Sequence, residues 1–448
     1  MPNEHRTDAV LEKNTKKNYA SVPGVLLLPM LFGMSLTCLE LIGNKRIATP
    51  AAPGLEHAKK LSDLSAQWMA ISSSMFFSAS LFSFSLFVCG MMKIKIDSAY
   101  KQIFLVSAGV FCVCSLAVSA TSNFLTLFLS RALIGAASAV VCGLCPPYYV
   151  SVFGDRIGTI LTVSNSFFIS IGIFVEGQAR LYFGNTAPNV IFYMISATGL
   201  ISFLLIAITV KNFASKEPAS DYSEEFTAVF SSTAPGARSS GAPWDRIAAC
   251  LCMHVLQQFT GINPILSEQG VIFKDTSAWG YPYAKTFFNC GGLLGSFIGM
   301  CVSSMLPSSL FGRYCFLIGL LAGSCFIPLV TEAPILSMWS SGMYMVFFSM
   351  AIGGLPWMLP SKLISDPRHL SLAIGVGSTV NWSISGLLLI FYRRLYLVVG
   401  RSLFYLFMAS SVGCGLFAWW ILKYSVKHER RRQVKEKREK IEQFAPAG

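Results

Sequence analysis

The sequence predicts an all-α polytopic membrane protein with about twelve transmembrane helices in two pseudo-symmetric six-helix bundles. Of its 448 residues, 53% are hydrophobic and only 13% are charged, a balance that soluble domains do not show. Apolar runs of roughly 20 residues, the length of a bilayer-spanning helix, recur along the chain. A polar stretch rich in Ser, Ala, Pro and Gly, Lys211 to Asp245, divides these runs six and six, as a flexible linker does.

The linker divides the chain into five expected segments. They are a cytoplasmic N-terminal segment (1–21), a first bundle (22–210), the linker (211–245), a second bundle (246–424) and a basic cytoplasmic tail (425–448). The first bundle is expected to contain the spans Val22 to Ile42, Gln67 to Met92, Gln102 to Ala120, Phe124 to Val150, Ile157 to Phe183 and Asn189 to Val210. The second is expected to contain Arg246 to Phe273, Ala284 to Met305, Tyr314 to Val330, Ile335 to Leu359, Leu372 to Tyr392 and Leu403 to Tyr424. One short helix is expected in the linker, around Ser223 to Phe230.

An even number of spans puts both termini on the same side of the membrane. Lys13, Lys16, Lys17 and the basic tail predict that this side is cytoplasmic, because positive charge gathers on cytoplasmic segments. The pair Arg393 and Arg394 falls on the outer side and disagrees. The polar, basic segment before the first span has no cleavable signal peptide, so the first span is expected to anchor the chain. We expect a monomeric multi-pass protein of the plasma membrane.

The formal charge of +13 does not indicate a nucleic-acid partner, because Lys and Arg concentrate in the termini and short loops. The 13 cysteines are scattered through apolar runs without His or Cys partners at metal-ligand spacing, which predicts free buried thiols and no metal or cofactor. Cys142 and Cys145 form a CxxC inside a membrane segment, where packing is the expected role. No nucleophile–base arrangement of an enzyme is present.

The expected seventh span carries an unusual group of amides. Gln257, Gln258 and Asn263 lie close enough in sequence to share one broad helix face with Gly261, and Pro264 follows directly. Unpartnered amides are costly in hydrocarbon, so they must face protein or a wet cavity. A broken helix with uncharged donors and acceptors is typical of a cavity for a neutral polyhydroxylated ligand. The alternative is that the amides join helices to one another.

The run QQFTGIN, Gln257 to Asn263, followed by Ile272 and Phe273, closely resembles the seventh-helix signature of the sugar-porter branch of the major facilitator superfamily. SRALIGAASAVVCGLCPPYY, GDRIG, GGLPWMLP and an Asn-Trp pair resemble further motifs of that family in matching order. The resemblance implies two bundles that rock about a central sugar site. It implies these substrate-binding residues: Gln257, Gln258, Asn263, Asn289, Trp357, Asn381, Trp382 and Ser166.

These positions match the family unevenly. Trp357 and Trp382 are expected to stack on a sugar ring or wall the site. Asn289 is the only amide in its span, but its distance from Gly312 does not match without gaps. Ser166 stands where the family has a ligand-binding Gln, so that amide is lost, and a role in helix packing is an equal alternative.

The two halves carry similar motifs at their expected cytoplasmic ends. PPYYVSVFGDR in the first half and LPWMLPSKLISDPR in the second each place Pro before a closely spaced Asp and Arg. Family carboxylates at these ends fall on Ser151 and Lys362, so we hypothesise that Asp155 and Asp366 replace them. The expected cytoplasmic gate comprises Arg131, Asp155, Arg156, Arg313, Lys362, Asp366 and Arg368. Ser267 and Glu268 stand where the family has two outer-gate tyrosines.

The first span contains the run LFGMS, Leu31 to Ser35, and proton-coupled family members carry Asp at the position of Ser35. Since Ser does not titrate near neutral pH, the expected function is facilitative (uniport) transport of a hexose such as glucose by alternating access. Glu176 and Glu268 are membrane-embedded acids that leave a proton-coupled sugar symporter open, although a partly hydrated outer vestibule also explains them. A non-transporting sugar-sensing receptor is the other alternative. The run KHERRRQVKEKREK suits either a lipid-binding patch or a solvated, partly helical tail.

Overall fold

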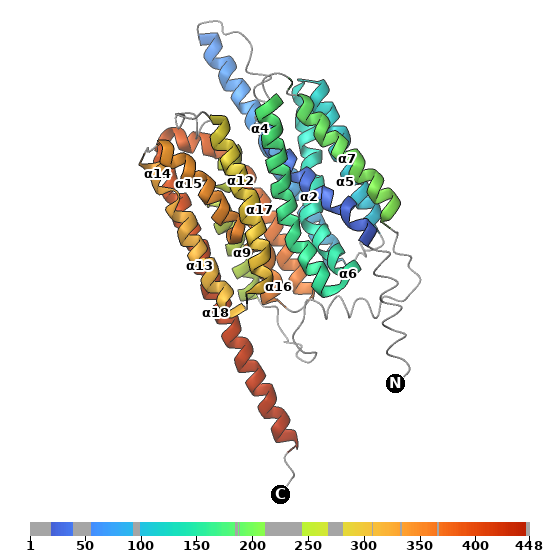
Figure 1. The fold of residues 1–448 in the computed structure, drawn as a ribbon, viewed down its shortest axis with the longest axis vertical. Coiled ribbons are helices and arrows are strands. Elements are labelled where there is room, and N and C mark those ends of the chain that lie inside the picture. Colours follow the sequence, from blue (N-terminus) through green and yellow to red (C-terminus); the bar gives the residue numbers. More distant parts are fainter. Residues whose placement is uncertain are drawn as a thin grey trace.

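The computed structural model describes residues 19–38, 55–92, 99–183, 187, 189–210, 244–267, 281–306, 308–331, 334–364 and 367–444. All the regular elements within these ranges are helices. They form an elongated bundle from which the last helix protrudes at one end (Figure 1). The expected N-terminal segment up to Asn18 and the short helix around Ser223 to Phe230 lie outside the described residues.

Within the described residues, the first half contains five helices and a short 3-10 turn. These are η1 (Tyr19–Ser21), α2 (Val22–Thr37), α4 (Leu55–Met91), α5 (Tyr100–Ala120), α6 (Phe124–Phe183) and α7 (Asn189–Thr209). Helix α6 covers two of the expected spans without a break in helical structure. Its two arms nevertheless fold back on one another, because the Thr162 hydroxyl lies 3.5 Å from the carbonyl of Pro146. Sixteen residues of straight helix would hold these groups about 24 Å apart.

The second half is built from shorter pieces. It contains α9 (Trp244–Gln258), α10 (Ile262–Ser267), α12 (Tyr281–Met305), α13 (Ser308–Ser324), α14 (Ile327–Val330), α15 (Pro334–Phe347), the π-helical turn η3 (Phe348–Ile352), α16 (Leu355–Leu363), α17 (Pro367–Val399), the 3-10 turn η4 (Gly400–Ser402) and α18 (Leu403–Phe444). Breaks fall inside three expected spans, the seventh, ninth and tenth. Helix α18 continues about 20 residues beyond the expected last span, through the basic stretch.

In the described part of the chain, ten segments are long and apolar enough to cross a membrane. They account for ten of the twelve expected spans. The other two expected spans correspond to the broken pair α9 and α10 and to α12. The predicted all-α fold with two groups of membrane helices is therefore confirmed.

Each half has its own buried hydrophobic cluster, and small residues bring helices together inside the first. Gly33 of α2 lies against the backbone carbonyl of Ile169 in α6, and Gly172 of α6 lies against that of Met30. A Cβ at either glycine would overlap that carbonyl. Glycine therefore permits the close packing of α2 on α6, as is common between membrane helices.

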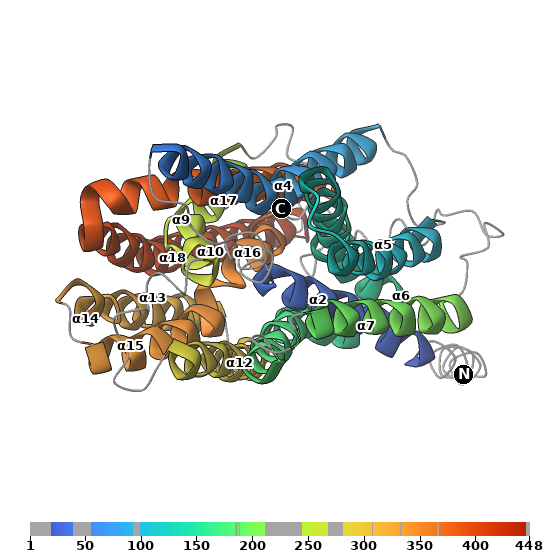
Figure 2. The ribbon, with the colours of Figure 1, turned by 90° about the horizontal axis from the view of Figure 1, so that it is seen from above.

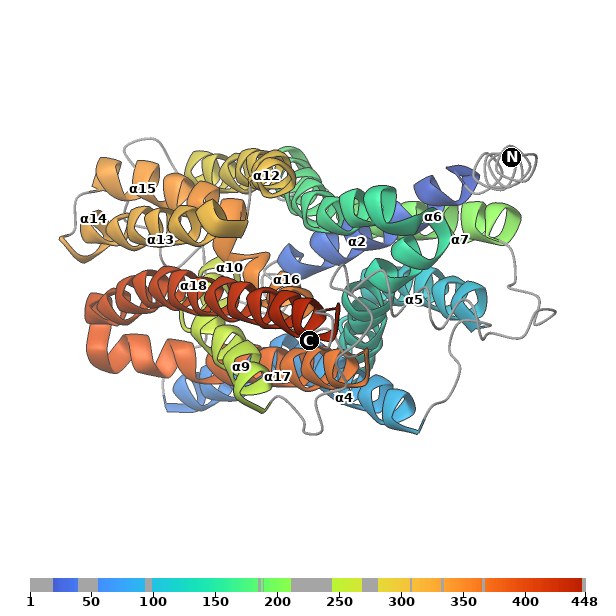
Figure 3. The ribbon, with the colours of Figure 1, turned by 90° about the horizontal axis from the view of Figure 1, so that it is seen from below.

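The two halves meet along two pairs of helices, α4 with α17 and α6 with α12, which lie side by side in both end views (Figures 2 and 3). The Ser80 hydroxyl of α4 lies 2.7 Å from the Ser383 hydroxyl and 3.0 Å from the carbonyl of Thr379, both in α17. Asn289 of α12 donates a hydrogen bond to the carbonyl of Ile173 in α6 at 3.5 Å. Hydrogen bonds of this kind are individually weak and exchangeable.

Candidate functional site

The amide-bearing span is broken between α9, which ends at Gln258, and α10, which begins at Ile262. Gly261 has a φ of 80°, a left-handed conformation that only glycine adopts without strain. Pro264 has no N–H, so the carbonyl four residues earlier, that of Thr260, has no helical donor. The buried hydroxyl of Tyr344 in α15 donates to this carbonyl at 3.1 Å. The predicted break is thus a defined turn, and the carbonyl of Thr260 that it leaves without a helical donor is hydrogen-bonded.

A second break, in the tenth expected span, frees two more carbonyls beside the first. Pro356 cannot bond back to the carbonyl of Ile352, and the N–H of Trp357 bonds to Gly354 rather than to Gly353. The side-chain amide of Gln257 donates to both freed carbonyls, to Gly353 at 2.8 Å and to Ile352 at 3.3 Å. Gln257 therefore connects the two broken helices. A π-turn beside such a site is typical of functional positions in helices.

Helix α17 completes the cluster from the other side. Asn381 donates to Oε1 of Gln257 at 2.8 Å, and the Ser385 hydroxyl donates to Oε1 of Gln258 at 2.8 Å. Asn263 of α10 donates to Oε1 of Gln258 at 2.7 Å and to the Ser385 hydroxyl at 2.9 Å. We call these five residues, Gln257, Gln258, Asn263, Asn381 and Ser385, the amide cluster.

The amide cluster is uncharged and mostly enclosed. Gln257, Gln258, Asn381 and Ser385 are buried, whereas Asn263 is half-buried. Its groups are neutral donors and acceptors, which match the hydroxyl groups of a neutral ligand. Because the cluster joins α9, α10 and α17 to one another and to the break between η3 and α16, it also performs the helix-joining role that the sequence left open.

Four other expected binding residues lie apart from this cluster. Among the described residues, no hydrogen bond joins Asn289, Trp357, Trp382 or Ser166 to the amides. Trp357 is half-buried and its ring is 5.2 Å from that of His254 in an edge-to-face arrangement. Ser166 is exposed on α6.

Trp382 and Asn289 reach across to the first half of the chain. The Trp382 ring lies 5.7 Å from that of Phe32 and 5.9 Å from that of Phe76. Asn289 packs beside Gly177, where a Cβ would overlap its side-chain amide. Both residues therefore lie where the halves meet, a place where a ligand between them would also bind.

Sequence reasoning missed three residues of the site. Ser385 lies one helical turn after Asn381, and His254 lies one turn before Gln258, so helical spacing was the available signal. His254 is buried, and its Nδ1 atom has no hydrogen-bond partner in the structure. Tyr344 had no such signal, because its contact with Thr260 depends on how α15 packs against α9 and α10.

Arg131 does not lie at the expected cytoplasmic gate. It is 1% exposed and donates from Nη1 to the carbonyl of Ser35 at 2.7 Å, near the end of α2. Its Nη2 lies 2.9 Å from Sδ of Met75. The start of α2 lies at the opposite end of the bundle, where the Tyr148 hydroxyl donates to Ser21. Because Asp155 follows Tyr148 in the turn of α6, we no longer assign Arg131 to that gate.

The rest of the expected gate is only partly described. Arg313 is exposed on α13, and Ser267 is the last residue of α10. Outside the described part of the structure lie Asp366, Glu268 and the side chains of Asp155, Arg156, Lys362 and Arg368. The gates therefore remain predictions from the sequence.

A charge swap tests the cytoplasmic gate. If Asp155 and Lys362 pair, Asp155→Lys and Lys362→Asp should each slow transport, and the double variant should recover most of the lost rate. The effect should be small, because a partly exposed pair contributes about 1 kcal/mol or less. Initial rates of labelled-sugar uptake provide the measurement, and independent, additive effects of the two changes would reject the pairing.

Comparisons with known proteins agree with this architecture. The family model described as "Sugar (and other) transporter" matches residues 232–429, and no curated protein matches the chain. A crystal structure of a D-xylose-proton symporter has a TM-score of 0.68 at 16% identity, covering 90% of this chain and 97% of that one. The proton:xylose symporter XylE bound to 6-bromo-6-deoxy-D-glucose has a TM-score of 0.67 at 16% identity, covering 91% and 96%.

A partially occluded inward-open conformation of the xylose transporter XylE from E. coli is also similar, with a TM-score of 0.64 at 15% identity and coverage of 90% and 97%. At this level of identity the similar structures establish the fold. The family model, which covers the amide-bearing half, adds the match in sequence. Residues 232–429 thus match the sugar-transporter family in sequence, and the chain as a whole shares the fold of solved sugar transporters.

Proposed function

We propose that the protein is a facilitative transporter of a hexose such as glucose, working by alternating access between the two halves of the chain. In this proposal the units are residues 22–210 and 246–424, and they rock about a site at the amide cluster. The protein acts as a monomer in the plasma membrane with both termini in the cytoplasm. The observation that carries the proposal is the uncharged amide cluster beside two broken helices.

The chemistry of the cluster supports a sugar as cargo. A hexose presents several hydroxyl groups, each of which both donates and accepts hydrogen bonds. When a sugar binds, these hydroxyl groups replace the hydrogen bonds that join Gln257, Gln258 and Asn263 to one another. The exchange costs little free energy, because each bond lost is replaced by one of the same kind. Half-buried Asn263 is the member from which such an exchange begins.

The surroundings of Arg131 support transport without proton coupling. Its guanidinium bonds to the backbone carbonyl of Ser35, a group that does not titrate. Cys38 provides a second weak contact, with Sγ 3.7 Å from Nη1. A cycle that moves a proton needs a group here that gains and loses it, and Ser35 is not such a group.

Proton-coupled sugar transport is the second candidate, because Glu176 is fully buried in α6. One of its oxygens is 2.6 Å from Arg180, while Oε2 has no hydrogen-bond partner in the structure. The similar structures include a proton:xylose symporter. A buried carboxylate paired with one arginine suits either a permanent ion pair or a proton carrier.

Labelled-sugar counterflow in proteoliposomes separates the two candidates. A uniporter exchanges labelled for unlabelled glucose without any gradient, and an imposed pH difference produces no accumulation, in the native protein or in Glu176→Gln. Accumulation that follows the pH difference and is lost in Glu176→Gln would establish symport instead. If glucose, fructose, xylose and polyols all fail to exchange, the cargo is not a sugar.

A further inference from the structure

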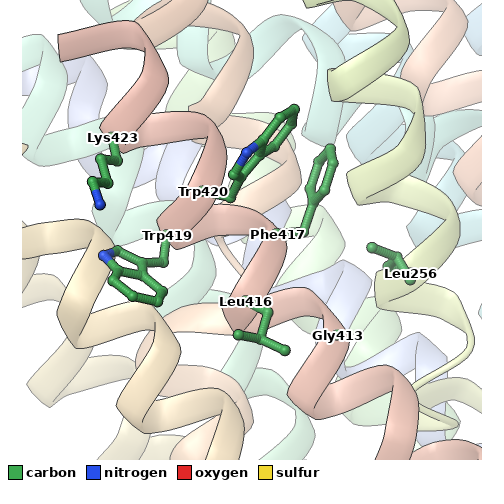
Figure 4. A pocket seen from close by; sticks show the side chains of 7 residues that line it. All are labelled: Leu256, Gly413, Leu416, Phe417, Trp419, Trp420 and Lys423. Atoms are coloured by element: carbon green, nitrogen blue, oxygen red, sulfur yellow. The ribbon is translucent and has the colours of Figure 1, made fainter. Parts of the chain in front are cut away.

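A groove on the outer surface of α18 lies apart from the amide cluster. It has a volume of about 500 Å³ and is lined by Leu256, Gly413, Leu416, Phe417, Trp419, Trp420 and Lys423 (Figure 4). All of these residues belong to α18 except Leu256, which belongs to α9. Six of the seven are apolar, and the one charge, on Lys423, lies at the end nearest the chain terminus. The groove is therefore apolar along most of its length and basic at one end.

The length of the groove matches one leaflet of a bilayer. Its deep end is at Gly413, where a Cβ would lie 3.8 Å from Cδ2 of Leu256, so the two helices close the groove there. Lys423 lies ten residues further along α18, a rise of about 15 Å. The hydrocarbon core of a bilayer is about 30 Å thick, so a groove of this length reaches from the midplane to one surface.

The side chains at the basic end are those of a membrane–water interface. Trp420 is 59% exposed, and its ring stacks on that of Tyr424 with centroids 6.1 Å apart. The Nζ of Lys423 is 5.5 Å from the centroid of the Trp419 ring. Trp and Tyr gather where lipid headgroups begin, and Lys extends its charge to the same level.

We propose that this groove binds an anionic phospholipid of the leaflet facing the chain termini, with one acyl chain along Leu416 and Gly413 and the phosphate at Lys423. The charge of the neighbouring sequence favours an anionic lipid over a zwitterionic one, since KHERRR begins four residues after Lys423. Gly413 provides the space, because a larger side chain there would fill the deep end beside Leu256.

The bound lipid touches the helix that carries the substrate site. Leu256 directly precedes Gln257, whose amide joins α9 to the carbonyl of Gly353. A lipid chain packed against Leu256 therefore contacts α9 one residue before the amide cluster begins. This inference does not depend on which cargo the transporter carries.

Fluorescence quenching by brominated lipids tests the proposal on the purified full-length protein in detergent micelles. Dibrominated phosphatidylserine and phosphatidylcholine are titrated separately, and the signal of Trp420 is obtained by subtracting that of a Trp420→Phe variant. We expect half-quenching at an about fivefold lower fraction of phosphatidylserine, since one lysine near a membrane contributes about 1 kcal/mol. Lys423→Gln should abolish this preference, and Lys423→Arg should retain it.

Two further variants complete the design. Arg394→Gln removes an exposed positive charge of α17 that does not line the groove, and should leave the preference unchanged. Gly413→Leu should reduce quenching by both lipids, in protein that elutes normally from a sizing column. The proposal would be overturned if the two lipids quenched Trp420 of the native protein with the same midpoint. It would also be overturned if the preference for phosphatidylserine remained in Lys423→Gln. Quenching by a brominated sterol alone would assign the groove to a different ligand and reject it equally.

Discussion

Replacing Gln257 by alanine is expected to remove most transport and to lower the stability of the folded protein. Besides a bond of 3.4 Å accepted from the neighbouring Gln258, the side chain makes three bonds of 2.8 to 3.3 Å to other segments, with the carbonyls of Ile352 and Gly353 and the amide of Asn381. All three partners lose their bond in Gln257→Ala, and two of them are carbonyls that have no helical donor. Each lost bond costs about 1 kcal/mol in a membrane protein, so the total is roughly 3 kcal/mol. We expect at least a tenfold fall in the initial rate of sugar uptake.

Asn263→Ala separates binding from stability and serves as the matched variant. Asn263 is half-buried, and Oε1 of Gln258 keeps the bond from Ser385 when Asn263 is removed. Its loss should therefore reduce uptake by about twofold to tenfold with little change in melting temperature. Uptake in proteoliposomes and thermal unfolding of the purified variants are the measurements. Unchanged transport kinetics in both variants would remove the amides from the site.

The fold was predictable because the length of an apolar run sets the number of spans, whatever the details of packing. What the sequence did not show is how the spans end. Helix α6 continues through the turn between two spans, as Thr162 and Pro146 reveal, because the turn itself is helical. Helix α18 continues to Phe444, since the Lys, Glu, Arg and Gln that dominate its tail are good helix formers.

The candidate site was predictable in part for the same reason. Gln257, Gln258 and Asn263 were grouped by spacing along one helix, which local geometry fixes. Ser385, which bonds to two of these amides, and Tyr344, which donates to the nearby carbonyl of Thr260, come from helices more than 80 residues away in sequence, and only tertiary packing brings them close.

The position of Arg131 was mispredicted for a different reason. Its expected place at the cytoplasmic gate followed from a family motif rather than from its depth in the span. The span begins at Phe124 and runs toward the turn that contains Asp155. Arg131 is seven residues from the start, so it lies about 10 Å into the span from the opposite end. The direction of the span therefore indicates the end of the bundle at which Arg131 lies better than the family motif does.

Replacing Gly261 by alanine should disrupt the site through the backbone itself. Gly261 has a φ of 80°, and an alanine in this left-handed conformation costs about 1–2 kcal/mol. A Cβ at this position would also overlap the ring of Phe407 in α18, which is buried and fixed by its aromatic neighbours. We expect the melting temperature to fall markedly and transport to be lost, because α10 carries Asn263 and begins at the next residue.

Gly400 provides the matched control for this substitution. It has a φ of 60°, in the same left-handed region, but a Cβ there would meet no atom within 4 Å. Gly400→Ala therefore has the backbone strain alone, and the difference between the two variants measures the overlap with Phe407. Adding Phe407→Leu to Gly261→Ala should recover part of the stability by relieving that overlap. Equal losses of stability in Gly261→Ala and Gly400→Ala would show that Phe407 and α18 move enough to accommodate the new Cβ at position 261. In that case the turn between α9 and α10 requires glycine for its backbone conformation only.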